Sequence, residues 1–210
     1  MAESGPAATV EGLAAAIAEC TSCELAKTRR NAVPGEGSRA ADIMFIGEGP
    51  GQREDESGRP FVGPAGKFLT EMLADIGLQR GDVFITNVVK CRPPGNRDPL
   101  PQEVTACSGW LKAQIAAIGP RVLVLLGRHA LQRFIPGARI SAEHGQIRRF
   151  GSISVMPMYH PAAALHNPGL RGACLDDFRR LRQFLEKPPE PAESPPEPDT
   201  APTPVQRSLF

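Results

Sequence analysis

Short apolar runs alternate along this chain with segments whose apolar residues recur at helical spacing. Strands of a parallel sheet are buried on both faces and appear as continuous apolar runs, whereas a covering helix shows one apolar stripe. The pattern predicts strands at 42–46, 83–89, 122–126 and 152–158, and helices at 10–20, 65–77, 101–118, 127–134 and 175–185. Residues 146–150 can pair with the last strand as a hairpin about Gly151. This alternation predicts a parallel sheet covered by helices on both faces.

Polar and glycine-rich connections follow the carboxyl ends of these expected strands. Those ends lie at Gly47, Asn87, Gly127 and His160. In an open parallel sheet, ligands bind in the crevice beyond the carboxyl ends of the strands. We therefore expect the connections to share one cleft.

The connection at 47–63 is far longer than a usual strand-to-helix connection. It contains five glycines, which let a backbone approach a ligand closely, three adjacent acids at 54–56, and Phe61 behind a proline. A mobile, solvated surface loop is one interpretation. A phosphate cradle is disfavoured, because the nucleotide-binding glycine spacing and the Gly-Lys-Ser/Thr ending are missing and the acids would repel phosphate. The other connections converge on the same edge, which favours a binding role.

Composition adds size, charge and location. The 210 residues suit one domain with a sizeable core, and no apolar stretch approaches the length of a membrane span. The N-terminus has no basic flank before an apolar core, so we expect no signal peptide and a cytoplasmic, nucleoid-associated protein. The net charge is +1, and residues 188–210 hold four acids and one arginine, so the rest of the chain carries +4. That balance is compatible with nucleic acid without indicating it.

Four of the five cysteines form a pattern. Cys20 and Cys23 are a close pair, and Cys91 and Cys107 flank a proline-rich loop. Disulfides are disfavoured in the cytoplasm, and four thiolates can hold either zinc or an iron–sulfur cluster, between which the spacing does not choose. Buried apolar cysteines are the alternative, and they describe Cys174 best. A metal here would join the N-terminal arm to the loop after the second strand, so its first role would be structural.

Four sequence motifs accompany these cysteines. They are Gly-Glu-Gly-Pro-Gly at 47–51, Gly-Arg-Pro-Phe-Val-Gly at 58–63, Thr-Asn-Val-Val-Lys-Cys-Arg-Pro-Pro at 86–94 and His-Pro-Ala-Ala-Ala-Leu at 160–165. Together they resemble the family-4 (iron–sulfur) uracil-DNA glycosylases, over roughly Cys20 to Lys187. The resemblance implies a three-layer α/β/α sandwich around a four-stranded parallel sheet. It also implies a [4Fe–4S] cluster on Cys20, Cys23, Cys91 and Cys107, and removal of uracil from DNA, which initiates base excision repair.

The chemistry of base removal fits the same residues. The sugar becomes oxocarbenium-like, the base leaves as an anion, and a duplex base must first be flipped into a pocket. Such a pocket needs an aromatic platform, a reader of the Watson–Crick edge and a donor to the developing oxyanion. The resemblance assigns these roles to Phe61, Asn87 and His160. A core aromatic, a strand-end turn residue and a satisfied histidine are the respective alternatives.

Two further positions of the first motif bear on specificity and on water. Glu48 resembles the residue that stands against C5 of uracil and would collide with the methyl group of thymine. Gly49 belongs to the uracil site, but in the best-known uracil glycosylase family an aspartate at this place orients the attacking water. Because that carboxylate is absent, Glu54, Asp55 and Asn96 are candidates for positioning water. A carboxylate near the sugar can equally stabilise the cation.

A non-catalytic iron–sulfur module, such as a DNA-damage sensor or an electron carrier, is the competing hypothesis. An electron carrier needs none of the three pocket residues, which argues against it. We expect a monomer that acts on uracil in single- or double-stranded DNA, with phosphates contacted by arginines at 92, 97, 148, 149 and 171.

The two ends of the chain differ from its body. Residues 1–9 are expected to be flexible, 10–187 to form the glycosylase domain, and 188–210 to be a disordered, proline-rich tail. The tail ends in Gln206-Arg207-Ser208-Leu209-Phe210, which resembles the short peptide with which bacterial proteins dock on the replicative sliding clamp. Leu209 and Phe210 would fill an apolar pocket, and Gln206 would hydrogen-bond beside it. A frayed end is the alternative.

Overall fold

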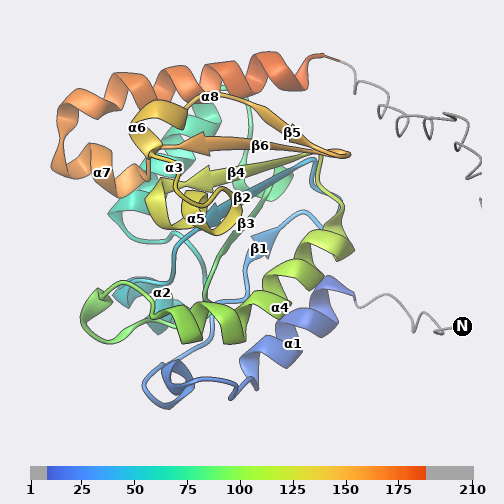
Figure 1. Ribbon diagram of the computed structural model, residues 1–210, viewed down its shortest axis with the longest axis vertical. Helices are drawn as coiled ribbons and strands as arrows, with labels where there is room; N and C mark the ends of the chain where they lie inside the picture. Colours follow the sequence, from blue (N-terminus) through green and yellow to red (C-terminus); the bar gives the residue numbers. More distant parts are fainter. Residues whose placement is uncertain (1–8, 188–210) are drawn as a thin grey trace, which may run out of the picture.

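The computed structural model describes residues 9–187, and its regular elements follow the alternation seen in the sequence (Figure 1). The expectations for the N-terminal residues, the proline-rich tail and the clamp-binding peptide lie outside the described residues. The strands are β1 (Glu36–Gly37), β2 (Ile43–Gly47), β3 (Phe84–Asn87), β4 (Val122–Leu126), β5 (Arg148–Phe150) and β6 (Ile153–Met158). The helices are α1 (Val10–Ala18), α2 (Gln52–Ser57), α3 (Pro64–Asp75), α4 (Pro101–Ile118), α5 (Gly127–Phe134), α6 (Ile140–Glu143), α7 (Pro161–His166) and α8 (Arg171–Leu185).

The strands form one sheet in the order β1-β3-β2-β4-β6-β5. The four inner strands are parallel, which confirms the expected four-stranded core, and β5 and β6 form the expected antiparallel hairpin. The short antiparallel strand β1 at the other edge was not expected, because two residues are too few to show a periodic pattern. All four parallel strands end at the same edge, where Gly47 of β2 pairs with Asn87 of β3.

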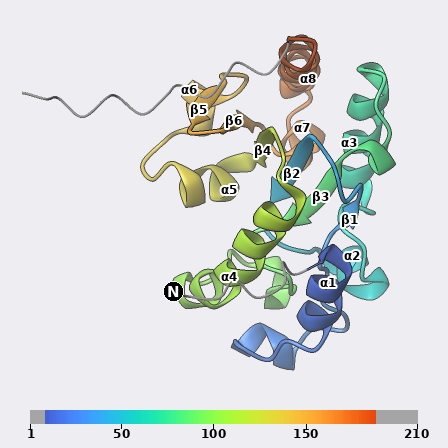
Figure 2. The ribbon, with the colours of Figure 1, turned by 90° about the vertical axis from the view of Figure 1, so that its right-hand side faces the viewer.

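Helices cover both faces of the sheet, so the fold is a three-layer α/β/α sandwich (Figure 2). Helices α3, α7 and α8 pack on one face, where the rings of Phe45 and Phe178 stack 5.6 Å apart. Helices α4, α5 and α6 pack on the other face, against Met44 and Ile46, and α1 packs on α4. Successive side chains of a strand point to opposite faces. Both sets are therefore buried, which explains why the strands appear as continuous apolar runs.

Helix ends follow local sequence signals closely. Proline occupies the first turn of α3 and of α4, where a missing N–H costs no hydrogen bond. Gly119 ends α4 in the left-handed conformation, as the sequence predicts. The long connection at 47–63 differs from expectation because it contains α2, a short helix of polar residues ended by Gly58. A polar helix has no apolar stripe, so the pattern could not reveal it. Within residues 9–187 no helix combines the length and the apolar run that crossing a membrane requires.

Candidate active site

A cavity of about 460 Å³ opens at the edge where the parallel strands end. Its walls come from the connections after β2 and β3, from α2 and α3, and from α7 with the residue before it. It is lined by Glu48, Gly49, Pro50, Gly51, Glu54, Phe61, Ala65, Asn87, Pro93, Asn96, Arg97, Asp98, His160, Ala162 and His166. The structure therefore brings together every pocket residue that the sequence suggested except Asp55, which does not line the cavity.

Phe61 is held in an unusual backbone conformation. Its φ of 52° is left-handed, and among the non-glycine residues of 9–187 only Asn96, which also lines the cavity, shares a positive φ. The guanidinium of Arg80 donates to the carbonyl oxygens of Pro60 and Phe61, at 2.7 and 3.1 Å. A Cβ on Gly66 would lie 1.7 Å from the Phe61 carbonyl oxygen, so α3 begins tightly against this residue. Strained residues of this kind persist where surrounding contacts over-determine them, and they cluster at functional sites.

Asn87 presents an unsatisfied acceptor at the end of β3. The residue is 1% exposed, and its Oδ1 has no hydrogen-bond partner among the described residues. A Cβ on Gly47 would lie 2.4 Å from this oxygen and 2.6 Å from the ring of Phe61. Only glycine at 47 therefore leaves room for both side chains. A buried acceptor without a partner costs free energy, which points to a ligand that donates to it.

A buried lysine fixes the backbone of Asn87. The Lys90 ammonium donates to the Asn87 carbonyl, to Thr86 Oγ1 and to Gln114 Oε1, each at 2.7 Å. Burial lowers the pKa of Lys90 to about 7. The backbone N–H of Lys90 also donates to Cys107 Sγ at 3.3 Å, so one residue contacts both the cavity residue and the cysteine group. The sequence reasoning did not single out Lys90, because its burial depends on α4.

His160 lies opposite Phe61, with the two ring centroids 5.6 Å apart. Burial lowers the pKa of His160 to about 4, against the opposing effect of the Glu54 carboxylate, so the ring is neutral near pH 7. Its Nδ1 accepts the Ala162 N–H at 3.1 Å, at the start of α7. A neutral ring that accepts at Nδ1 carries its proton on Nε2. His160 is thus a fixed, uncharged N–H donor.

The acids of the long connection take different roles. Glu54 Oε1 accepts the backbone N–H groups of Val62 and Gly63, at 2.8 and 2.9 Å. A Cβ on Gly51 would lie 2.8 Å from the second oxygen, Oε2. Asp55 is buried and accepts the backbone N–H of Arg30, so it ties the N-terminal arm to α2.

Asn96 holds the proline-rich loop beside the cavity. Its Oδ1 accepts from Arg92 Nε at 2.7 Å, and its φ is 56°. In the same loop, Arg97 forms two hydrogen bonds with the buried Glu103 carboxylate, at 2.7 and 2.9 Å. That pair makes Arg97 an anchor of the loop.

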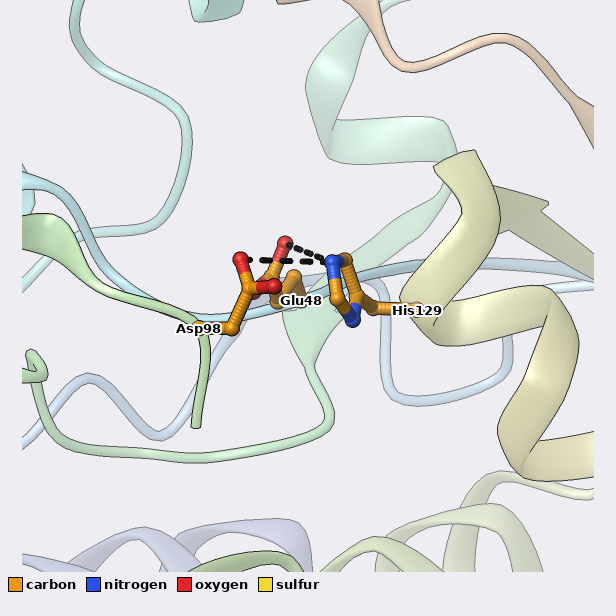
Figure 3. Close-up of side chains that lie close together, drawn as sticks. All are labelled: Glu48, Asp98 and His129. Atoms are coloured by element: carbon orange, nitrogen blue, oxygen red, sulfur yellow. Dashed lines mark ion pairs between the residues drawn. The ribbon is translucent and has the colours of Figure 1, made fainter. Parts of the chain in front are cut away.

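Glu48 stands at the rim of the cavity with two partners that the sequence reasoning missed (Figure 3). Its carboxylate lies 3.7 Å from His129 Nε2, which in turn lies 3.3 Å from Asp98 Oδ1. Burial and, to a smaller extent, the charge of Asp98 raise the pKa of Glu48 to about 7, against the opposing effect of Arg128. A signal for His129 was available, since it follows Gly127, one of the expected strand ends.

The cysteines at 20, 23, 91 and 107 enclose a second, small cavity between α1, α4 and the loop after β3. Three of their sulfurs accept hydrogen bonds: Cys91 from Arg29 at 3.1 Å, Cys20 from the Trp110 indole at 3.3 Å, and Cys107 from the Lys90 backbone. Cys174 lies in the core on the opposite face of the sheet, away from this group. The structure thus separates the four patterned cysteines from the fifth.

Comparison with known proteins places these features in context. The family model of the uracil DNA glycosylase superfamily matches residues 34–185. The chain is 48% identical over 183 residues to the type-4 uracil-DNA glycosylase of Saccharolobus solfataricus, covering 82% of this chain and 85% of that protein. It is 48% identical over 180 residues to that of Archaeoglobus fulgidus, covering 81% and 90% respectively. A third such protein, from Sulfurisphaera tokodaii, is 46% identical over 192 residues, covering 86% of each chain.

Proposed function

The chain belongs to the type-4 uracil-DNA glycosylases of the uracil DNA glycosylase superfamily, and from this premise we propose that it hydrolyses the N-glycosidic bond of deoxyuridine in DNA. The reaction releases uracil, leaves an abasic site and starts base excision repair. The observation that carries the proposal is the buried, unpartnered Oδ1 of Asn87 in a cavity shared with Phe61 and His160.

Uracil is bound flat and read along one edge. Its face stacks on the ring of Phe61, which the left-handed backbone and Arg80 hold in place. The Asn87 Oδ1 accepts the N3–H of uracil, and the amide N–H₂ donates to O4. Cytosine has no proton on N3 and carries an amino group at position 4. Its N3 acceptor would therefore face the Asn87 Oδ1 acceptor, and its amino donor would face the amide N–H₂ donor. Lys90 supports this selection because it fixes the Asn87 backbone.

His160 stabilises the leaving group. The C1′–N1 bond breaks with its electron pair passing to the base, and negative charge builds up on uracil O2. The Nε2–H of the neutral His160 donates to that oxygen, and this bond strengthens as the charge develops. A low pKa suits the role, because the ring must keep its proton on Nε2 without first taking a second one at Nδ1.

Water reaches C1′ of the oxocarbenium-like sugar with help from the long connection. Glu54 is fixed through Oε1 by two backbone N–H groups, which leaves Oε2 to orient the water and accept its proton. Its negative charge also stabilises the sugar cation. Asn96 is the second candidate, through the amide nitrogen that its bond to Arg92 leaves unused. Gly49 leaves space beside the bound uracil, at the position where the best-known uracil glycosylase family carries the aspartate that orients the attacking water.

Glu48 excludes thymine. We place its carboxyl against C5 of uracil, where a methyl group would collide with it. Apolar contacts alone distinguish one methyl group by only about 1–3 kcal/mol, so a steric or polar wall is needed against so abundant a base.

The four patterned cysteines fit an iron–sulfur cluster. Within residues 9–187, the one group of three or more acidic, histidine or cysteine ligand atoms that all lie within 4.8 Å of one another is Glu48–Asp98–His129. The cysteine sulfurs are therefore spread more widely than around a single zinc ion, where Zn–S bonds of about 2.3 Å put sulfurs about 3.8 Å apart. This spread supports the larger [4Fe–4S] group, and N–H donors to thiolate sulfur are typical of such sites. When bound, the cluster cross-links the N-terminal arm, the loop after β3 and α4.

The partner proposed for the C-terminal peptide is the replicative sliding clamp. Gln206, Leu209 and Phe210 would bind it at the end of the proline-rich tail, raising the enzyme's effective concentration near new DNA. Titration of the clamp with full-length protein should show binding that Leu209→Ala/Phe210→Ala abolishes, with uracil excision on a short oligonucleotide unchanged. Equal binding by both proteins would reject this partner.

A gel assay on a uracil-containing oligonucleotide tests the main proposal. Full-length protein should release free uracil and leave an alkali-labile abasic site without cutting the strand, on both single- and double-stranded DNA. A matched thymine oligonucleotide should stay intact. Absence of release from either uracil substrate would favour the non-catalytic iron–sulfur module instead.

A further inference from the structure

Glu48, Asp98 and His129 come from three separate segments and meet at the rim of the cavity (Figure 3). Glu48 follows β2, Asp98 lies in the loop before α4, and His129 lies in the first turn of α5. Glu48 and Asp98 line the cavity, whereas His129 is not among the lining residues. The carboxyl groups of Glu48 and Asp98 thus lie between His129 and the cavity.

Arg128 ties this group together and argues against a cation site. Its Nε donates to His129 Nε2 at 2.8 Å, and its Nη2 donates to Asp98 Oδ2 at 3.1 Å. Two carboxylates and an imidazole can hold a divalent ion. Here, however, the guanidinium already uses the imidazole lone pair and one Asp98 oxygen, and its charge would repel a metal ion. The arrangement instead fixes the imidazole ring, and with it the surface that Glu48 packs on.

The position of Glu48 depends on these neighbours. Glu48 and Asp98 offer oxygens within 4.8 Å of one another, so two full charges there would repel. Burial and the Asp98 charge raise the pKa of Glu48 to about 7, which reduces that repulsion near neutral pH. The Glu48 side chain has several rotatable bonds and is partly exposed, and no hydrogen bond within the described residues holds its carboxyl. The imidazole of His129 packs against this carboxyl, with Nε2 3.7 Å from the nearer oxygen, and so limits the positions that the carboxyl can take at the cavity wall.

We propose that His129 is a positioning residue that holds the Glu48 carboxyl against the C5 edge of the bound base, and so sets the discrimination against 5-substituted uracils. This inference rests on the proposed function, since it assigns the wall that excludes thymine. Without the ring, the Glu48 side chain turns toward solvent, away from Asp98. The cavity then has room for a methyl-sized group at C5 of the base, while Phe61, Asn87 and His160 keep their positions.

The test compares excision of 5-fluorouracil and 5-bromouracil from otherwise identical oligonucleotides. Both halogens help the base to leave as an anion, but fluorine is close to hydrogen in size and bromine is close to a methyl group. The ratio of their kcat/KM values therefore reports the size of the wall. Full-length protein, used as purified with its metal centre, should prefer 5-fluorouracil strongly. His129→Ala should reduce that preference by at least about fivefold, because a methyl-sized group in a pocket is worth roughly 10–200-fold.

Three matched variants separate positioning from general loss of structure. His129→Gln keeps an acceptor for Arg128 and a side chain of similar reach for Glu48 to pack on, so it should restore the preference to within about twofold of wild type. Gln132→Ala, an exposed position on the same helix, should leave it unchanged. In a Glu48→Ala background, His129→Ala should add no further loss of preference, since residues acting through one contact are not additive.

Several results would overturn the proposal. An unchanged halogen preference in His129→Ala, or an equal fall in the excision of uracil and both halogenated bases, would show that His129 does not position Glu48. Full additivity with Glu48→Ala would do the same. If His129→Ala does not fold, His129→Asn, whose amide is too short to keep the contact, takes its place and the same ratio decides. Failure of the wild-type protein to excise uracil at all would instead reject the proposed function.

Discussion

At the scale of single residues, His160 shows how burial and one hydrogen bond prepare a donor. Its Nδ1 is occupied by the Ala162 N–H, so Nε2–H is the donor that can face a base. We expect His160→Ala to lower kcat by about 100- to 1,000-fold, since one oxyanion donor is worth about 2.7–4 kcal/mol. KM should change much less, because the bond strengthens only in the transition state. Single-turnover kinetics on a uracil oligonucleotide measures both, and a loss below tenfold would assign His160 a structural role only.

The same residue gives a pH dependence of stability with a definite sign. Its folded pKa of about 4 lies below the ordinary value of about 6.5, so between these pH values the unfolded chain binds a proton that the folded chain does not. Stability therefore falls as the pH falls through this window, by up to roughly 3 kcal/mol. Urea unfolding at pH 7 and pH 5 should show a larger fall for wild type than for His160→Gln. Parallel falls in the two proteins would contradict the buried neutral state.

Asn87→Asp tests the reading of the base edge. A carboxylate can accept the N3–H of uracil but cannot donate to O4, and it would place a charge beside that oxygen. We expect the rate of uracil excision to fall much more than the rate of cytosine excision, so that the ratio of the two rates decreases. Competition between uracil and cytosine oligonucleotides measures the ratio. A preserved preference would place base recognition elsewhere in the cavity.

At the scale of elements, the start of α3 is fitted to the back of Phe61. A Cβ on Gly66 would meet backbone atoms of Phe61, which cannot move aside as a flexible side chain can. We expect Gly66→Ala to destabilise the fold by at least about 2 kcal/mol and to reduce excision, because the platform shifts. Gly109→Ala, inside α4 with no atom beyond the helix's own backbone within 4 Å of the added methyl, is the matched control and should gain up to about 1 kcal/mol. Thermal unfolding compares them, and similar melting temperatures would contradict the tight fit.

At the scale of the whole molecule, the cysteine group holds together segments that are far apart in sequence. Arg29 reaches Cys91 and also donates to the carbonyl oxygens of Cys20 and Ala18, so the N-terminal arm rests on this group. We expect purified protein to show a broad absorbance near roughly 400 nm from thiolate-bound iron. Cys91→Ser should lose that absorbance and melt at lower temperature, because the arm and the proline-rich loop lose their shared anchor.

Cys174→Ala is the control for that prediction. Cys174 packs in the core on the other face of the sheet, and burial raises the pKa of its thiol to about 11. The absorbance should therefore be unchanged in this variant. Colourless wild-type protein with stoichiometric zinc would overturn the iron assignment, and loss of colour in Cys174→Ala would overturn the assignment of ligands.

The sequence by itself determined the order of strands and helices, the parallel core, the helix ends at prolines and Gly119, and the motifs that meet in the cavity. These follow from local periodicity and from the conformational limits of glycine and proline, which act within a few residues along the chain. The sequence pattern did not predict α2 and β1, because neither element shows a periodic signal.

Only the tertiary structure decided how the site is tuned. The proton on Nε2 of His160, the unpartnered oxygen of Asn87, the lysine that links it to the cysteines and the contact of Glu48 with His129 all depend on distant segments. Hydrogen-bond partners and pKa values are set by every neighbour and by how much water each group loses. The sequence gives the type of each side chain, but its neighbours in space decide which atom donates a hydrogen bond, which group carries charge and which polar atom is left for a ligand.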